Sequence, residues 1–404
     1  MKKVTLAFIL VLFVLTLFPF EVLGEPVKLV LWHSYRGEEK AALEEVGKNF
    51  AKSYPDIEVK YLQVPYDAFP DKITAAIPRG KGPDVFIFGH DRIGDWVERE
   101  SLEPIGIWVD DELRKQFIPI ALEALTYEDA LYGLPTAVKC VSIIYNKKFV
   151  KNPPKNTEEL IKLAKSLKKP SGDMYGLVYE NQLTYYNSGW LFGFGGGIFD
   201  KDDNPIINSP GNVKALTFIH RLLRIDKIMP DEISNTLVTA LFNKNQAAMV
   251  LSGPWFLGEI DESIPYGVAP LPLISDVNGP AKPFLTAEGL IMSARCAHKK
   301  EAFQLMKYFS STEAAVIMAT KGNQPVANLG AYKNEAVKNH PFIPIFRKQA
   351  ESAVPMPNIP EMKMVWTPFD LAIGKVLNET MKPKAALDEA QEKVEKAIKQ
   401  YRGE

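Results

Sequence analysis

The stretch Gly82-Pro-Asp-Val-Phe-Ile-Phe-Gly-His-Asp-Arg92 places a short apolar run directly before a charged tip. Val85–Phe88 has the length and composition of a buried strand, and glycines mark both of its ends. Such a strand delivers Asp91 and Arg92 to the carboxyl edge of a sheet, which is where open α/β sheets bind ligands. A neighbouring carboxylate and guanidinium accept from and donate to several hydroxyls, which suits a polyol. The alternative is a surface ion pair that caps the next helix.

The chain before this stretch alternates strands and helices. Strand-like runs occupy Val27–Leu31 and Ile57–Val64, ahead of the strand at Val85–Phe88. Apolar residues recur at helical spacing over Glu38–Tyr54 and Phe69–Ile77. A β-α-β-α-β order of this kind implies a parallel sheet wrapped by helices.

The rest of the chain continues in the same manner. Further strands are expected at Val138–Tyr145, Ala247–Leu251 and Thr286–Ser293. Further helices are expected from Thr157, over Asn212–Ile225, Lys299–Phe309, Thr312–Thr320, Tyr332–Lys338 and Ala385–Tyr401, and around Trp366. The glycine-rich run Gly193–Gly197 does not match a phosphate-binding fingerprint and is interpreted as a turn.

Composition narrows the classes of function. The chain has 404 residues, 46% of them hydrophobic, enough for two or three core-forming units. Its 48 Lys and Arg residues against 49 Asp and Glu residues give a net charge of −1. This charge provides no electrostatic attraction to nucleic acid or to an anionic membrane. The scattered histidines lack metal-ligand spacing, and we expect neither metal nor cofactor. Cys140 and Cys296 lie in apolar runs typical of free thiols, although export would permit a disulfide.

The N-terminus predicts export. Lys2 and Lys3 precede an apolar run from Val4 to Phe20, and Val22-Leu23-Gly24 then offers residues that a signal peptidase reads. We predict cleavage after Gly24 and a periplasmic location. The alternative is an uncleaved anchor, but the run is short for a membrane span.

Seven peptides along the chain carry a family resemblance. They are Gly82-Pro-Asp84, His90-Asp-Arg92, Ile144-Tyr-Asn-Lys147, Asn152-Pro-Pro-Lys155, Gly253-Pro-Trp255, Tyr266-Gly-Val268 and Met356-Pro-Asn-Ile-Pro360. In this order, from about Lys28 to the C-terminus, the chain resembles the maltose-binding protein family, the solute-binding components of sugar-importing ABC transporters.

The resemblance implies an α/β periplasmic-binding-protein fold. In that fold two α/β lobes are joined by hinge strands, and an oligosaccharide binds in the cleft between them as the hinge closes. The hinges are expected near Ala137–Val141 and Ala287–Met292. The expected division is a signal peptide over 1–24, an N-terminal lobe of 25–138 plus 292–324, and a C-terminal lobe of 139–291 plus 325–404.

The resemblance also implies which side chains touch the sugar. Asp91 and Arg92 match family residues that hydrogen-bond the ligand, and Tyr185, Trp255 and Trp366 match its aromatic platforms. Aromatic rings cover the apolar CH faces of a sugar, whereas charged groups satisfy its hydroxyls. For each of these aromatic residues the alternative is a place in the core, where most aromatic side chains lie.

Five residues depart from the pattern of the maltose receptor. Phe88 replaces a tryptophan, Tyr35-Arg36 an Asp-Lys pair, Lys139 a glutamate and Asp370 an arginine. A lysine cannot accept a hydrogen bond, so we expect Lys139 and Asp370 to shift specificity toward a differently linked or carboxylate-bearing oligosaccharide. The alternative is that Lys139 pairs with a carboxylate such as Asp91 and never touches ligand. The full set of expected substrate-binding residues is Ser34, Arg36, Phe88, Asp91, Arg92, Lys139, Tyr185, Trp255, Trp366 and Asp370.

These observations predict the solute-binding receptor of an ABC importer. It would bind an oligosaccharide, maltodextrin-like or related, and deliver it as a monomer to permease subunits in the inner membrane, without enzymatic activity. Two alternatives stay open. One is a secreted glycoside hydrolase that pairs Asp91 with Glu180 or Glu288. The other is a carbohydrate-binding protein without a role in transport.

Overall fold

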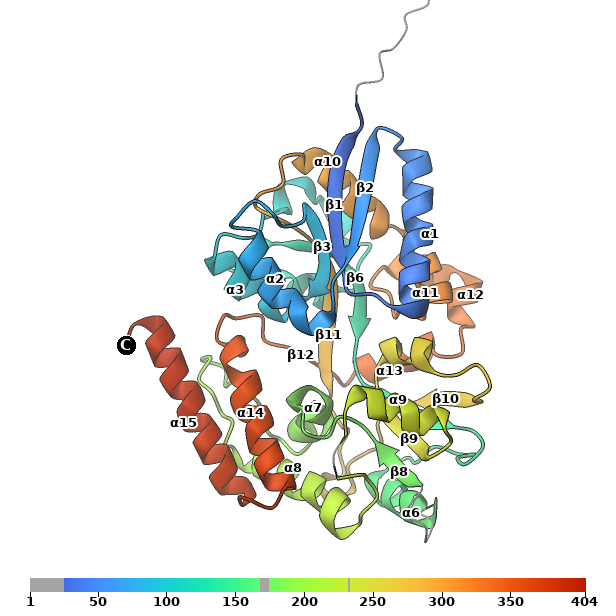
Figure 1. Cartoon of the computed structure of the whole chain (residues 1–404), viewed down its shortest axis with the longest axis vertical. Helices are drawn as coiled ribbons and strands as arrows, with labels where there is room; N and C mark the ends of the chain where they lie inside the picture. Colours follow the sequence, from blue (N-terminus) through green and yellow to red (C-terminus); the bar gives the residue numbers. More distant parts are fainter. Residues whose placement is uncertain (1–24, 168–173, 232) are drawn as a thin grey trace, which may run out of the picture.

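The first sheet is built around three parallel strands near the N-terminus. They are β1 (Val27–His33), β2 (Ile57–Gln63) and β3 (Val85–Gly89), with β1 between the other two. Helices α1 (Gly37–Ser53) and α2 (Phe69–Ala76) connect them and cover the sheet in the upper lobe of Figure 1. The predicted β-α-β-α-β unit is therefore confirmed.

The computed structural model describes residues 25–167, 174–231 and 233–404.

Two antiparallel strands lead from this sheet toward the second lobe. β11 (Phe284–Met292) pairs with β3 and with β6 (Gly133–Lys139), and its first residues pair with β12 (Val354–Pro355). β6 ends at Lys139, and β7 (Ser142–Asn146) begins in the other sheet. The single strand predicted over Val138–Tyr145 is wrong, because this apolar run passes from the core of one lobe into the core of the other.

The second sheet has the strand order β10-β7-β9-β8. Its other strands are β8 (Tyr175–Val178), β9 (Ala247–Ser252) and β10 (Tyr266–Ala269), and β8 runs parallel to β9. A small hairpin pairs β4 (Thr126–Tyr127) with β5 (Ala130–Leu131).

The remaining helices cover both sheets. They are α3 (Ile93–Glu98), α4 (Asp111–Arg114), α5 (Pro119–Ala124), α6 (Thr157–Leu167), α7 (Thr184–Gly193), α8 (Pro210–His220), α9 (Asn235–Asn243), α10 (Lys299–Phe309), α11 (Thr312–Gly322), α12 (Glu335–Lys338), α13 (Ile343–Ala350), α14 (Met362–Leu377) and α15 (Pro383–Arg402). Short helical segments are η1 (Tyr66–Ala68), η2 (His90–Arg92), η3 (Gly106–Trp108), η4 (Arg221–Ile225), η5 (Pro254–Glu259), η6 (Ser275–Val277) and η7 (Leu329–Lys333). The helix predicted over Lys299–Phe309 is confirmed with the same first and last residues as α10.

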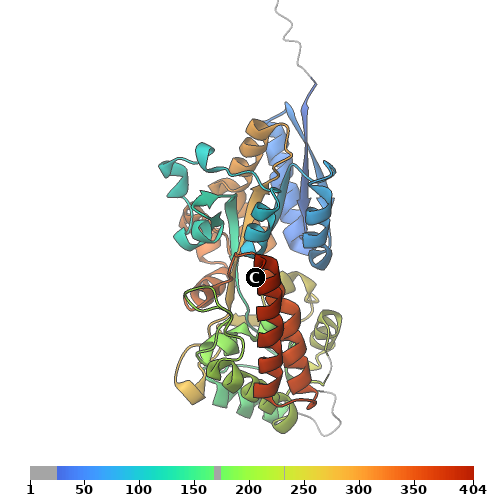
Figure 2. The same ribbon diagram turned by 90° about the vertical axis from the view of Figure 1, so that its left-hand side faces the viewer.

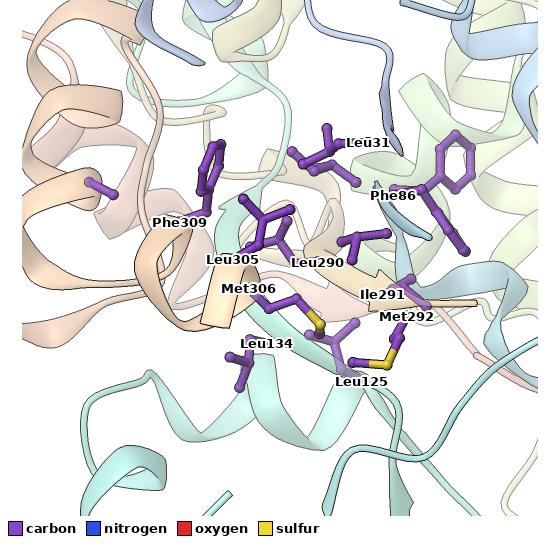
Figure 3. Close-up of a cluster of buried hydrophobic side chains, with 14 of the residues drawn as sticks. Leu31, Phe86, Leu125, Leu134, Leu290, Ile291, Met292, Leu305, Met306 and Phe309 are labelled. Atoms are coloured by element: carbon purple, nitrogen blue, oxygen red, sulfur yellow. The ribbon is translucent and has the colours of Figure 1, made fainter. Parts of the chain in front are cut away.

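Each lobe has its own apolar core. In the first lobe, Leu305, Met306 and Phe309 of α10 face Leu290 and Leu134 of the two connecting strands (Figure 3). Side chains of this size contribute about 1.5–3 kcal/mol each when fully buried. The connecting strands are thus anchored firmly in the first lobe.

The core of the second lobe lies between its sheet and the C-terminal helices. Trp190 and Phe218 pack edge to face with 5.4 Å between ring centroids, and Phe369 of α14 and Leu387 of α15 belong to the same buried cluster. The two C-terminal helices lie side by side along the lower lobe in Figures 1 and 2.

A small cluster of mostly small side chains lies between the two cores. It consists of Ala121, Ala124, Val138, Leu285, Ala287 and Ala327. Val326, Ala331, Val337 and Ile343 pack into the core of the first lobe, although the predicted division gave 325–404 to the second.

Three further predictions concern processing, the membrane and the thiols. Residues 1–24, the predicted signal peptide, lie outside the described residues. Within residues 25–167, 174–231 and 233–404, no helix has the length and apolar character needed to cross a membrane. Cys140 and Cys296 are both buried free thiols, so the disulfide is not formed.

Candidate functional site

The tip that follows β3 carries Asp91 and Arg92 in η2. Asp91 is 7% exposed, and its Oδ2 lies 3.3 Å from Nε of Arg92. Asp91 Oδ1 is buried and has no hydrogen-bond partner among the described residues. Neither side chain caps α3, so the capping alternative does not hold. The tip thus presents a buried acceptor and an adjacent guanidinium.

His90 fixes this tip to β11 and to the chain after β12. The backbone N–H of Ala287 donates to His90 Nδ1 at 3.0 Å, so Nδ1 carries no proton. Nε2 therefore holds the hydrogen and donates it to the carbonyl oxygen of Met356 at 2.8 Å. Burial lowers the pKa of His90, which keeps the ring in this neutral form. One imidazole consequently connects β3 with both β11 and the chain after β12.

The three predicted aromatic platforms come from three separate elements and lie close together. Tyr185 of α7 and Trp255 of η5 have ring centroids 6.0 Å apart. Phe284 lies 6.2 Å from Tyr185 and 6.0 Å from Trp366 of α14. All three platforms are half-buried, and Nε1 of Trp366 is buried without a hydrogen-bond partner in the described chain.

Thr286 in β11 links the two groups of candidate residues. Its hydroxyl lies 3.1 Å from the hydroxyl of Tyr185. A Cβ built at Gly89, the last residue of β3, would lie 3.1 Å from Thr286 Cγ2 and 3.2 Å from Asp91 Oδ1. The tip of the first lobe and the aromatic group of the second therefore meet at this strand, and any side chain at position 89 would be crowded by Thr286 and Asp91.

Phe88 does not line the site. It is 2% exposed and stacks on Phe69 at 4.8 Å and on Tyr66 at 4.9 Å between ring centroids. Tyr66 is 51% exposed and covers Phe88. The sequence analysis missed Tyr66, although it lies two residues after a predicted strand whose carboxyl end lies at the same sheet edge as Asp91.

Lys139 is held within a buried charge cluster. Its ammonium lies 2.7 Å from Glu39 and 3.0 Å from Glu288, and the Tyr35 hydroxyl donates to Glu288 at 2.9 Å. Burial alone would lower the pKa of Lys139, but Glu288 and Glu39 outweigh it and raise the pKa. This environment agrees with the alternative interpretation, in which Lys139 pairs with a carboxylate. The carboxylates are those of Glu39 and Glu288, however, and not that of Asp91.

Asp370 is likewise engaged by protein groups. Its Oδ1 accepts from both the backbone N–H and the hydroxyl of Thr184, each at 2.6 Å. Thr184 opens α7. Burial raises the pKa of Asp370, and the bonds from Thr184 oppose that shift. Asp370 thus holds the start of the helix that carries Tyr185.

Arg36 spans the junction between the lobes. Its guanidinium lies 2.9 Å from Glu259 of η5. The adjacent Gly37, with φ of +47°, approaches Gly258 so closely that a Cβ would lie 3.4 Å from its carbonyl oxygen. Ser34 follows β1 nearby and is half-buried. The two lobes therefore touch here through glycines and one ion pair.

Residues 34–316 match the family described as bacterial extracellular solute-binding proteins. The chain belongs to this family. Over 383 residues this solute-binding protein is 30% identical to the maltotriose-binding protein of Pyrococcus abyssi, a match that covers 93% of this chain and 81% of the relative. It is 27% identical over 386 residues to the galactooligosaccharide-binding protein of Bacillus subtilis, a match that covers 92% of this chain and 90% of the relative.

Solved structures confirm the two-lobed fold of this solute-binding protein. The maltose/maltodextrin-binding domain of Bdellovibrio bacteriovorus bound to maltotriose matches with a TM-score of 0.85 and 28% identity, covering 92% of this chain and 100% of the other. The maltotriose-binding protein of Thermus thermophilus bound to maltotriose matches with a TM-score of 0.83 at the same identity and coverage.

Proposed function

We propose that this chain is the receptor of a sugar-importing ABC transporter and binds an oligosaccharide between its lobes. The observation that carries the proposal is that Asp91 from one lobe and Tyr185 from the other approach each other at Thr286. Arg92 lies beside Asp91, and Trp255 lies beside Tyr185. Aromatic rings next to a buried acceptor and a guanidinium match a sugar, which has apolar faces and hydroxyl rims. The names of the relatives support an oligosaccharide of the maltotriose or galactooligosaccharide kind.

Binding would close the two lobes around the sugar. Ligand groups come from both lobes, so only the closed arrangement satisfies all of them, and the sugar shifts the population toward it. The small side chains between the lobes permit bending, because little side-chain volume must be repacked there. We place the N-terminal lobe at 25–138 plus 292–324, extended by the residues up to α13 that share its core.

The cellular setting belongs to the same proposal. The signal peptide would be cleaved after Gly24, and the monomeric protein would act in the periplasm beside permease subunits in the inner membrane. N-terminal sequencing of the exported protein tests the cleavage, and a mature chain that begins at Met1 would exclude it.

The decisive experiment is a thermal-shift screen of the purified mature chain against neutral and acidic oligosaccharides, followed by calorimetry. A ligand at a hundred times its dissociation constant stabilises the folded state by about 2.7 kcal/mol. Chromatography of the recovered sugar distinguishes a receptor from a hydrolase, since a receptor returns it intact. Stabilisation by none of the sugars contradicts the proposal, and cleavage of a bound sugar favours the hydrolase.

A further inference from the structure

Tyr66 is the outermost of three stacked rings at the junction between the lobes. Phe88 lies 4.8 Å from Phe69 with an interplanar angle of 19°, and 4.9 Å from Tyr66 with an angle of 23°. Phe69 and Phe88 are fully buried, whereas Tyr66 keeps 51% of its surface exposed. The stack fixes the orientation of the Tyr66 ring, so little conformational entropy remains to be lost when a ligand covers its free surface.

The hydroxyl of Tyr66 lies beside groups already placed in the candidate site. It is 3.8 Å from the point where a Cβ of Gly89 would lie, and Asp91 Oδ1 is 3.2 Å from the same point. Burial and the Asp91 carboxylate raise the pKa of the Tyr66 hydroxyl, so it remains a protonated donor. A sugar on this ring would therefore meet the unpartnered acceptor of Asp91.

The charges around the ring disfavour an acidic sugar. Asp91 and Arg92 offset each other, whereas Asp67 and Glu180 add negative charge close to one another. The neighbouring Lys139 offers no compensation, because Glu39 and Glu288 already hold it. A carboxylate on the ligand would thus face net repulsion from these acidic side chains.

We propose that Tyr66 is the sugar-binding platform of the N-terminal lobe, and that it forms with Asp91 a subsite for one uncharged pyranose unit. This proposal rests on the proposed function. The ring covers the apolar face of the pyranose, and Asp91 Oδ1 accepts a hydrogen bond from one of its hydroxyls. Phe88, which replaces a tryptophan of the maltose receptor, packs against the inner face of the Tyr66 ring.

Calorimetry with maltotriose, a neutral galactooligosaccharide and trigalacturonate tests the subsite. The variants are Tyr66→Ala, Tyr66→Leu and Tyr66→Trp, because leucine keeps Phe88 covered but offers no ring face. For the neutral sugar that the wild type binds, we expect Tyr66→Ala and Tyr66→Leu to weaken affinity about tenfold to a hundredfold, and Tyr66→Trp to retain it. Tyr401→Ala, which removes a 41%-exposed tyrosine on α15, is the matched control and should leave affinity unchanged.

Each outcome of this experiment supports or overturns a distinct statement. Wild-type binding with unchanged affinity in Tyr66→Leu overturns the platform while the proposed function stands. Tighter binding of trigalacturonate than of either neutral sugar overturns the uncharged class. Absence of binding by the wild type to all three sugars contradicts the proposed function itself and removes the basis of the subsite. Thermal unfolding of each variant without sugar shows whether a loss of affinity reflects a loss of folded protein.

Discussion

Substituting Lys139 by methionine tests whether the charge cluster is structural. The lysine side chain is 5% exposed, and two carboxylates lie within 3.0 Å of its ammonium. At an effective dielectric constant of about 20, each contact amounts to roughly 6 kcal/mol of attraction, most of which offsets the desolvation of the charges. Removing the lysine leaves Glu39 and Glu288 uncompensated, which typically costs about 3–5 kcal/mol. We expect urea unfolding to show a loss of that size for Lys139→Met.

Two further measurements distinguish this interpretation from a ligand role. Unpaired buried carboxylates bind protons more tightly in the folded state, so we expect the stability of Lys139→Met relative to the wild type to improve as the pH falls. Adding Glu288→Gln removes one of the two like charges and should recover part of the loss. The preference among neutral and acidic oligosaccharides should remain that of the wild type. A Lys139→Met variant of normal stability with an altered sugar preference would refute the reasoning.

Four other substitutions address the aromatic group, the tip and the junction. Trp255→Ala and Trp366→Ala should each weaken sugar binding by about 1.5–3 kcal/mol in calorimetry, and normal binding by destabilised variants would instead identify them as core residues. Burial lowers the folded-state pKa of His90 below its unfolded value of about 6.5, so its contribution to stability is lost as the pH falls from about 6.5 through the lowered folded-state pKa. His90→Gln should flatten the pH dependence of stability, measured by urea unfolding, over that range, and an unchanged slope would exclude this role. Arg36→Ala removes a partly exposed pair with Glu259 and should lower affinity by about 0.2–1 kcal/mol only at low salt, whereas an equal effect at high salt would contradict an ionic contribution.

Local sequence patterns predicted individual helices and strands well where a single feature, such as the spacing of apolar residues, determined the structure. The helix over Lys299–Phe309 follows from apolar spacing alone, and the strand at Val85–Phe88 from an apolar run between glycines. The strand predicted over Val138–Tyr145 failed because hydropathy reports burial but not which core a residue enters. Its break at Cys140–Val141 is set by the separation of the two sheets.

The candidate site was predicted less completely, since its geometry depends on contacts between distant parts of the chain. Asp91 could be found from its place after a strand. The partners of Lys139 could not, because Glu39 lies 100 residues earlier and reaches it only in the folded chain. Tyr66 lies at the end of a predicted strand, but nothing local shows that its ring covers Phe88. Long-range stacking of this kind has no periodic signal in the sequence.

The burial of both native cysteines has a practical consequence. Burial raises the pKa of Cys140 and Cys296 to about 12, so almost none of either thiol is ionised at neutral pH, and thiol-directed reagents attack the thiolate. A cysteine placed at the exposed position of Asp67 would therefore be the preferred site for a maleimide dye, with both native cysteines left in place. A dye that brightens or dims as the lobes approach would turn the protein into an optical sugar sensor.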